Sequence, residues 1–204
     1  RVFVAPNTTE VCPIEFVPSK KKNLLFIGTL YRGKGIDLLL DAFKKAKDIT
    51  KKSIQLVIIG DGEMKDSIIQ YIQKNNLQDS VQLKGAIYDE SRLAKEFQEA
   101  LLCISPSQGG LSCPKSMGYG VPFVCRKDAI TGGEIYHTTN GINGIHYESD
   151  MDLTGILVDA MNYPEKYVEM GRKAKDYYDN HATIQHMARG AIDAFDYVIN
   201  CKSL

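Results

Sequence analysis

The sequence predicts an α/β fold, a Rossmann-like parallel sheet flanked by helices and ending in helices. Up to residue 150, apolar runs of strand length alternate with segments of helical period, which is the pattern of a parallel sheet with crossover helices. Strand-like runs then stop, and three helical segments follow. Glycine-rich loops also lie between several runs and the helices after them, as at the carboxyl edge of such a sheet.

Seven short apolar runs are predicted as strands, and amphipathic stripes between and after them are predicted as helices. Apolar residues at steps of three and four mark helices within 36–46, 64–72 and 184–199, and the last stripe continues for over four turns. No repeat, low-complexity segment or second domain boundary appears, so residues 1–204 are predicted as a single domain. The predicted strands are Val2–Ala5, Leu24–Gly28, Gln55–Ile59, Val81–Lys84, Leu101–Ser105, Phe123–Cys125 and Gly144–Tyr147.

Composition excludes several classes of protein. The 204 residues are 44% hydrophobic and 25% charged, as in an ordinary soluble domain. Acids and bases balance at 25 each, so no overall field attracts nucleic acid, and the run 20–22 of three lysines is expected to form a solvated turn. No apolar run reaches the roughly 20 residues of a membrane span, and the first ten residues lack a signal-peptide core.

Cysteine and histidine spacing predicts neither a disulfide framework nor a metal site. The five cysteines include no C-x-x-C pair, which favours a reducing cytoplasm, and Cys103 and Cys125 fall within apolar runs and are expected in the core. His181 and His186 are five residues apart, off the spacing that places two ligands on one helical face.

The stretch "LLFIGTLYRGKGIDLLLDAF" (24–43) resembles a phosphate-binding loop between a strand and a helix. Gly28, Gly33 and Lys34 fit the Walker pattern G-x-x-x-x-G-K-[ST], but Gly35 has no hydroxyl for magnesium, which argues against a nucleoside triphosphatase. A glycine-rich turn with a solvated Lys34 is the simpler interpretation. The stretch "IGDGEMKD" fails as a dinucleotide fingerprint, and no G-x-S-x-G elbow surrounds any serine.

Five loops are expected to gather beyond the carboxyl ends of the strands, where ligands bind in open parallel sheets. Four of them carry glycine beside a helix start, which lets backbone N–H groups approach an anion. The loops are "GTLYRGKG", "GDGE", "GAIYDE", "SPSQGGLSCPKS" and "RKDAITGGE".

Six stretches in order resemble the C-terminal, donor-binding domain of a GT-B fold glycosyltransferase of family 4 (group 1). They cover nearly the whole chain and are "VAPNTTE", the loop stretch 24–43, "LVIIGDGE", "VQLKGAIYDESRL", "ALLCISPSQGGLSCPKSMGYGVPFV" and "GGEIYHTTNGINGIHY". The resemblance implies that the loops hold the diphosphate of a nucleotide sugar without a metal or other cofactor. It also implies retaining transfer of a hexose or related sugar to a glycan or lipid-linked acceptor in cell-surface polysaccharide synthesis.

The sequence departs from that family at two places. The family's loop arginine is replaced by Thr29, although Arg32 lies in the same loop and Lys34 keeps the family's lysine. Ser107 and Lys115 stand where the central motif has two glutamates with seven residues between them, and the chain resembles a subset of the family that lacks this pair. A degenerate domain that binds a nucleotide or a partner protein without chemistry is therefore the alternative function.

The resemblance assigns roles to particular residues. Lys34, Lys115 and Glu134 are the catalytic candidates, the lysines for the leaving diphosphate and Glu134 for a sugar hydroxyl. Solvation of Lys115 and helix capping by Glu134 remain open as alternatives. The predicted donor-binding residues are Gly28, Thr29, Arg32, Gly33, Gly85, Ala86, Ile87, Ser107, Gly109, Gly110 and Leu111, of which Gly85, Ala86 and Ile87 would face the base through backbone groups.

The expected partners are a nucleotide sugar, the acceptor, and the missing N-terminal domain of the same protein, since the chain looks like the second half of a GT-B enzyme. Neither nucleic acid nor a transmembrane segment is expected. The predicted location is cytoplasmic, with contact at the inner membrane face only through the full-length protein.

Overall fold

The structure, a computed structural model, describes residues 1–201, the last of them by its backbone alone. It contains a six-stranded sheet in the order β3-β2-β1-β4-β5-β6, with every neighbouring pair parallel. The predicted Rossmann-like fold ending in helices is confirmed. The strands are β1 Asn23–Ile27, β2 Gln55–Ile59, β3 Val81–Leu83, β4 Ala100–Ile104, β5 Phe123–Arg126 and β6 Gly144–Tyr147.

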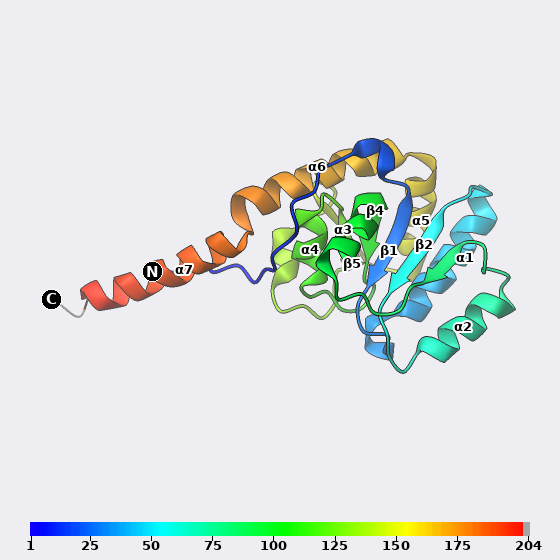
Figure 1. Cartoon of the computed structure of the whole chain (residues 1–204), viewed down its shortest axis with the longest axis horizontal. Coiled ribbons are helices and arrows are strands. Elements are labelled where there is room, and N and C mark those ends of the chain that lie inside the picture. The colour runs from blue at the N-terminus through cyan, green and yellow to red at the C-terminus, as the bar shows by residue number, and fades with distance from the viewer. Residues whose placement is uncertain (202–204) are drawn as a thin grey trace.

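Helices cover both faces of this sheet (Figure 1). The α-helices are α1 Ile36–Thr50, α2 Lys65–Lys74, α3 Glu90–Glu99, α4 Ser112–Gly118, α5 Asp150–Asn162, α6 Pro164–His181 and α7 Ile184–Cys201. Short 3-10 turns are η1 Pro18–Lys20, η2 Arg32–Lys34 and η3 Glu134–His137.

Successive side chains of β1 point to opposite faces of the sheet, and each face has its own apolar core. Leu24 and Phe26 point to the face packed by α1, α2 and α5, whereas Leu25 points to the face packed by α3, α4 and α6. All three side chains are almost fully buried, as expected for a central parallel strand. The predicted core positions of Cys103 and Cys125 are confirmed, because both are fully buried on the second face.

The N-terminal segment is not a strand, so the predicted strand Val2–Ala5 is wrong. Its residues lie alongside α7, and the two extend together away from the sheet (Figure 1). The rings of Phe3 and Tyr197 are 5.5 Å apart, centroid to centroid. Val2 and Val4 are 89% and 73% exposed, since no neighbouring strand covers them.

The three lysines at 20–22 do form a turn before β1, but one of them is not solvated. Lys21 is buried, and its ammonium donates hydrogen bonds to the carbonyls of Phe97 at 2.9 Å and Tyr119 at 3.1 Å. These carbonyls lie at the C-terminal ends of α3 and α4, where a cation is favourable. Lys21 therefore joins two helices at the amino edge of the sheet.

The strand order changes direction between β1 and β4. β1 pairs with β2 on one side and with β4 on the other, so the chain leaves β1 for one half of the sheet and later returns to the other half. In open parallel sheets this switch point separates two loops at the carboxyl edge and leaves a crevice there. In the described residues, the loops after β1, β3 and β4 meet at this place.

Candidate functional site

A cleft of about 420 Å³ lies at the switch point, beyond the carboxyl ends of β1 and β4. A smaller hollow of about 190 Å³ adjoins it and shares the residues at the end of β1 and in the loop after β3. The cleft is lined by Thr9, Ile27, Gly28, Thr29, Lys34, Ile87, Tyr88, Glu90, Leu93, Gly110, Leu111, Ser112 and Lys115.

Lys34 supplies a cation from the loop between β1 and α1. Its side chain reaches back over the end of β1, because a Cβ placed on Gly28 would lie 3.5 Å from Lys34 Cε and 3.9 Å from Nζ. Partial burial lowers the pKa of Lys34, and the negative charge of Glu134 opposes that shift. In the described part of the chain, no hydrogen-bond acceptor or ion-pair partner contacts the ammonium, so it is available to an anion.

Gly35 explains locally why this loop is not a P-loop. Its φ of 69° is left-handed, and a Cβ there would lie 2.4 Å from the Ser107 hydroxyl oxygen. The hydroxyl-bearing residue of a Walker motif therefore does not fit at this position. The backbone N–H of Ser107 donates to the Lys34 carbonyl at 3.3 Å, which ties the loop after β4 to the loop after β1.

Lys115 is the second cation of the cleft, and it is already paired. Its ammonium lies 2.6 Å from the carboxylate of Glu90, with the Lys115 side chain 14% exposed and that of Glu90 47%. α4 spans Ser112–Gly118, so Lys115 stands in the last turn of this helix. At that position its charge is favourable to the helix dipole instead of opposing it.

Glu134 does not line the cleft. The side chain is buried, and one carboxylate oxygen accepts from Asn7 Nδ2 while the other accepts from the Gly132 backbone, each at 2.6 Å. Its charge nevertheless acts on Lys34. Glu134 is thus an anchored anion outside the cleft lining, held by a residue 127 positions away in the sequence.

The structure brings five of the eleven predicted donor-binding residues to the cleft and a sixth to the adjoining hollow. Ala86 lines the adjoining hollow, and the Gly85 carbonyl accepts from the Gly60 backbone at 2.9 Å. Five predicted residues are absent from the lining of both cavities, and Arg32 among them is exposed on η2. Those placed on the cleft wall are Gly28, Thr29, Ile87, Gly110 and Leu111, and those outside both cavities are Arg32, Gly33, Gly85, Ser107 and Gly109.

Sequence reasoning missed six residues of the cleft wall, of which Ile27 and Leu93 are apolar. Tyr88 is 91% exposed and lines both cavities, which gives a base or sugar a flat ring to pack on. Tyr88 and Glu90 belong to the loop "GAIYDE", where their aromatic and acidic side chains were the available signal. Thr9 and Ser112 carried no comparable signal.

The carboxylates near the cleft have partners among the described residues. Glu90 pairs with Lys115, Glu134 binds two N–H groups, and Asp61 pairs with Lys65 at 3.0 Å. The described part of the chain contains no group of three or more His, Cys, Asp or Glu side chains placed to hold a metal ion. The arrangement offers an anion two lysines, and it offers a cation little.

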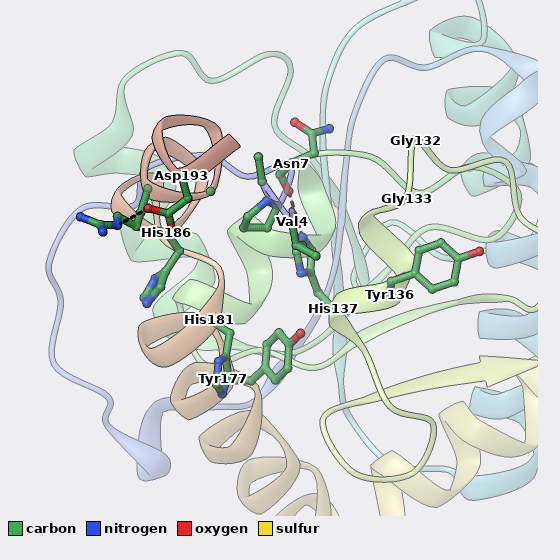
Figure 2. A pocket seen from close by; sticks show the side chains of 14 residues that line it. Val4, Asn7, Gly132, Gly133, Tyr136, His137, Tyr177, His181, His186 and Asp193 are labelled. Carbon is green, nitrogen blue, oxygen red and sulfur yellow. Dashed lines mark hydrogen bonds and ion pairs between the residues drawn. The ribbon is translucent and has the colours of Figure 1, made fainter. Parts of the chain in front are cut away.

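A larger hollow of about 780 Å³ lies elsewhere, between the N-terminal segment, η3 and the helices α6 and α7 (Figure 2). None of the predicted site residues lines it. It is away from the switch point, so the smaller cleft with its free cation is the better candidate for the functional site. No helix in the described residues has both the length and the apolar character needed to cross a membrane.

Comparison with known proteins identifies the family. The family model of glycosyl transferases group 1 matches residues 7–177. The chain is 28% identical over 162 residues to the uncharacterized glycosyltransferase MJ1178 of Methanocaldococcus jannaschii, covering 75% of this chain and 42% of that protein. Over 72 residues it is 35% identical to a Campylobacter jejuni N-acetylgalactosaminyltransferase that acts on a diphospho-undecaprenol, covering 35% of this chain and 19% of that protein.

Solved structures share the fold. S. aureus TarM, in complex with Fondaparinux, alpha-GlcNAc-glycerol and UDP, superposes with a TM-score of 0.77 at 24% identity, covering 91% of this chain and 37% of TarM. Anabaena Alr3699/HepE in complex with UDP superposes with a TM-score of 0.71 at 17% identity, covering 88% and 50%. This chain thus spans half or less of each relative's length. On the family match over most of its length, the chain belongs to the glycosyl transferases group 1 family.

Proposed function

We propose that this domain binds the diphosphate of a nucleotide sugar in the switch-point cleft. The observation that carries the proposal is the Lys34 ammonium, which is partly buried over Gly28 and has no partner in the described residues. A partly buried ammonium without a hydrogen-bond or ion-pair partner is stabilised when an anion binds to it. Family relatives solved with UDP support a nucleoside diphosphate as that anion.

The nucleoside would extend from Lys34 toward the loop after β3. Ile87 and Tyr88 form a wall common to the cleft and the adjoining hollow, and the backbone at Ala86 continues this wall in the hollow. A base could pack on the Tyr88 ring while the backbone groups there read its edge. The identity of the base would therefore depend on main-chain geometry more than on side chains.

The reaction would be retaining transfer of a hexose or related sugar to a glycan or lipid-linked acceptor, in cytoplasmic synthesis of cell-surface polysaccharide. When the bond to the sugar breaks, negative charge gathers on the departing diphosphate, and preorganised cations stabilise it. Lys34 is placed for this role. Lys115 could contribute only after exchanging Glu90 for the ligand, and Glu134 would act through Lys34 from outside the cleft lining.

An N-terminal domain of the same protein would complete the enzyme and bring the acceptor. α7 presents apolar side chains to solvent, with Phe195 70% and Ile199 64% exposed, next to the exposed Val2 and Val4 of the N-terminal segment. Such a contiguous apolar surface is typical of an interface. The greater length of the relatives supports a further domain as its partner.

A binding module without chemistry is the second candidate. The observation in its favour is the Lys115–Glu90 ion pair, which occupies the cleft position where the family places a motif acid. A cleft that neutralises its own cation is poorly suited to stabilising a leaving group. Under this alternative the domain would hold a nucleotide or a partner and catalyse no transfer.

Titration of the chain with UDP, GDP, ADP and TDP, and then with sugars of the preferred nucleotide, tests the proposal. We expect one diphosphate to bind weakly, and no transfer by these 204 residues alone. Transfer is expected when the full-length protein is supplied with donor and acceptor. If the full-length protein binds donor but neither hydrolyses nor transfers it, the binding module is the correct function. If no nucleotide binds, the nucleotide-binding role is refuted under both candidate functions.

A further inference from the structure

The loop after β1, which carries Lys34, is joined to the loop after β4 by two hydrogen bonds. The Ser107 backbone N–H donates to the Lys34 carbonyl at 3.3 Å, and the Tyr31 hydroxyl donates to Oε1 of Gln108. The backbone bond is longer than an ordinary N–H···O contact, so much of the link depends on the two side chains. Tyr31 and Gln108 are both half-buried and stand 77 positions apart in the sequence.

Gln108 belongs to a loop that is itself held from two sides. The Ser105 hydroxyl donates to the Gln108 carbonyl at 2.6 Å, and Gln108 pairs with Ile130 in an isolated parallel bridge. The Ile130 N–H also donates to the Ser107 carbonyl at 3.0 Å, which joins the loop after β5 to the same place. Gln108 is therefore a fixed acceptor for the Tyr31 hydroxyl.

Tyr31 in turn covers the short turn that ends at Lys34. A Cβ placed on Gly33 would lie 3.0 Å from Cζ of the Tyr31 ring and 3.2 Å from its hydroxyl oxygen, so the ring lies over the bare backbone of Gly33. The Tyr31 carbonyl also accepts from the Lys34 N–H at 3.0 Å, since Tyr31 is the N-cap of η2. Gly33 and Gly35 leave this turn free to adopt other conformations unless such contacts restrict it.

Lys34 extends from this turn into the cleft. Its side chain lines the cleft and reaches back over Gly28, and no hydrogen-bond acceptor or ion-pair partner among the described residues holds its ammonium there. The place of the ammonium therefore depends on where the turn is held. A cation that is already in place binds an anion more tightly than one that must first be ordered, because binding then costs less conformational entropy.

We propose that Tyr31 is a positioning residue that holds Lys34 at the cleft by binding Gln108, a contact we call the Tyr31–Gln108 latch. Without the Tyr31 hydroxyl, one long backbone bond is left between the two loops, and Lys34 spends less time in the position that binds an anion. The proposal takes its ligand, a nucleoside diphosphate, from the proposed function. The latch itself is measurable in the ligand-free chain.

The first test measures the exchange of amide protons with water by NMR, without a ligand. Tyr31→Phe removes the hydroxyl and keeps the ring over Gly33. The amides of Lys34 and Gly35 donate within this turn at 3.0 and 3.1 Å. We expect both to exchange about three- to tenfold faster in the variant, because the turn opens more often. Gln108→Met removes the acceptor at similar length and should have the same effect, with no further increase in the double variant.

Tyr71→Phe is the matched control. The Tyr71 hydroxyl also donates to a side-chain oxygen on another element, Oδ1 of Asp41, and neither residue lines the cleft. Amide exchange at Lys34 and Gly35 should not change in this variant. An equal increase in both phenylalanine variants would mean a general effect on the fold and would overturn the proposal. Unchanged exchange in Tyr31→Phe would overturn it as well.

The second test is NMR titration with UDP, GDP, ADP and TDP, continued with the one that the wild type prefers. Its affinity should fall about three- to tenfold in Tyr31→Phe. In a Lys34→Ala background the same substitution should have no further effect, because the latch acts through Lys34. Unchanged affinity in Tyr31→Phe, or a further loss in that background, would overturn the positioning role. If the wild type binds none of the four, the proposed function fails, and amide exchange alone decides whether the latch holds Lys34.

Discussion

The Lys115 ammonium lies 2.6 Å from the Glu90 carboxylate, and this pair joins the start of α3 to α4 across the wall of the cleft. A diphosphate entering the cleft would compete with Glu90 for the same cation. We therefore expect Glu90→Gln to tighten binding of the preferred nucleoside diphosphate about three- to tenfold, measured by calorimetry. Stability should fall by about 1 kcal/mol, because Lys115 is mostly buried and loses its partner.

Glu96→Gln provides the matched control for this experiment. Glu96 also lies on α3, and its carboxylate pairs with Lys84 at the same distance of 2.6 Å, but neither residue lines the cleft. Nucleotide affinity should not change in this variant. A weaker affinity in Glu90→Gln would show that Glu90 contacts the ligand directly, contrary to the competition argued above.

Lys34 should account for much of the affinity for a diphosphate. A charge-assisted contact in a partly wet cleft contributes roughly 1.5 to 3 kcal/mol, so Lys34→Ala should weaken nucleoside diphosphate binding about ten- to a hundredfold. Lys34→Met keeps the length of the side chain and should weaken binding equally if the affinity depends on the charge of Lys34. The free energy of unfolding should change by less than about 0.5 kcal/mol.

Lys52→Ala is the control for net charge, because Lys52 is exposed before β2, at the amino edge of the sheet. Its affinity should equal that of the wild type. Unchanged affinity in both Lys34 variants would mean that the loop after β1 is a turn that does not bind the diphosphate.

Donor binding should need no divalent metal. The described residues offer no cluster of ligating side chains, and the carboxylates around the cleft are engaged by Lys115, by Asn7 and Gly132, and by Lys65. Titration of the chain with its preferred nucleotide should give the same affinity in excess EDTA as in 5 to 10 mM magnesium, within about twofold. Loss of binding on chelation would refute this prediction.

The sheet could be predicted closely because local pattern determines it. β2 and β6 have the predicted bounds, since each is an apolar run ended by a glycine or a charged residue. The run at 2–5 has the same local character but no strand beside it, and it lies against α7 instead. A strand requires a hydrogen-bonding neighbour, which apolar pattern alone does not report.

The site could be predicted only in part, because its electrostatics depends on pairs far apart in sequence. Lys34 and the glycines of its loop were evident from one stretch of sequence. The partner of Lys115 lies 25 residues away and that of Glu134 lies 127 residues away. Charge pairing across such distances follows from the packing of α3, α4 and η3, which the periodicity of each element does not determine.

Lys21 lies at the edge of the sheet opposite the cleft, and its burial makes the free energy of unfolding depend on pH. Burial lowers the pKa of its ammonium from the usual 10.5 to about 7. Between these values the unfolded chain holds a proton that the folded chain has released, so the free energy of unfolding rises with pH. This contribution is complete above about pH 10.5 and is lost as the pH falls through about 7.

Lys21→Met removes the titrating group and keeps the length of the side chain. We expect the wild type to gain up to about 4 kcal/mol relative to this variant between pH 7 and pH 10, measured by urea unfolding at each pH. Taking the difference cancels the titration of tyrosines and other lysines that both proteins share.

Lys20→Met is the control, because Lys20 is an exposed neighbour whose ammonium contacts only Gln98 among the described side chains. Its free energy of unfolding should change with pH in parallel with that of the wild type. A Lys21→Met curve that is also parallel would mean that the carbonyls of Phe97 and Tyr119 keep the buried ammonium charged throughout this range.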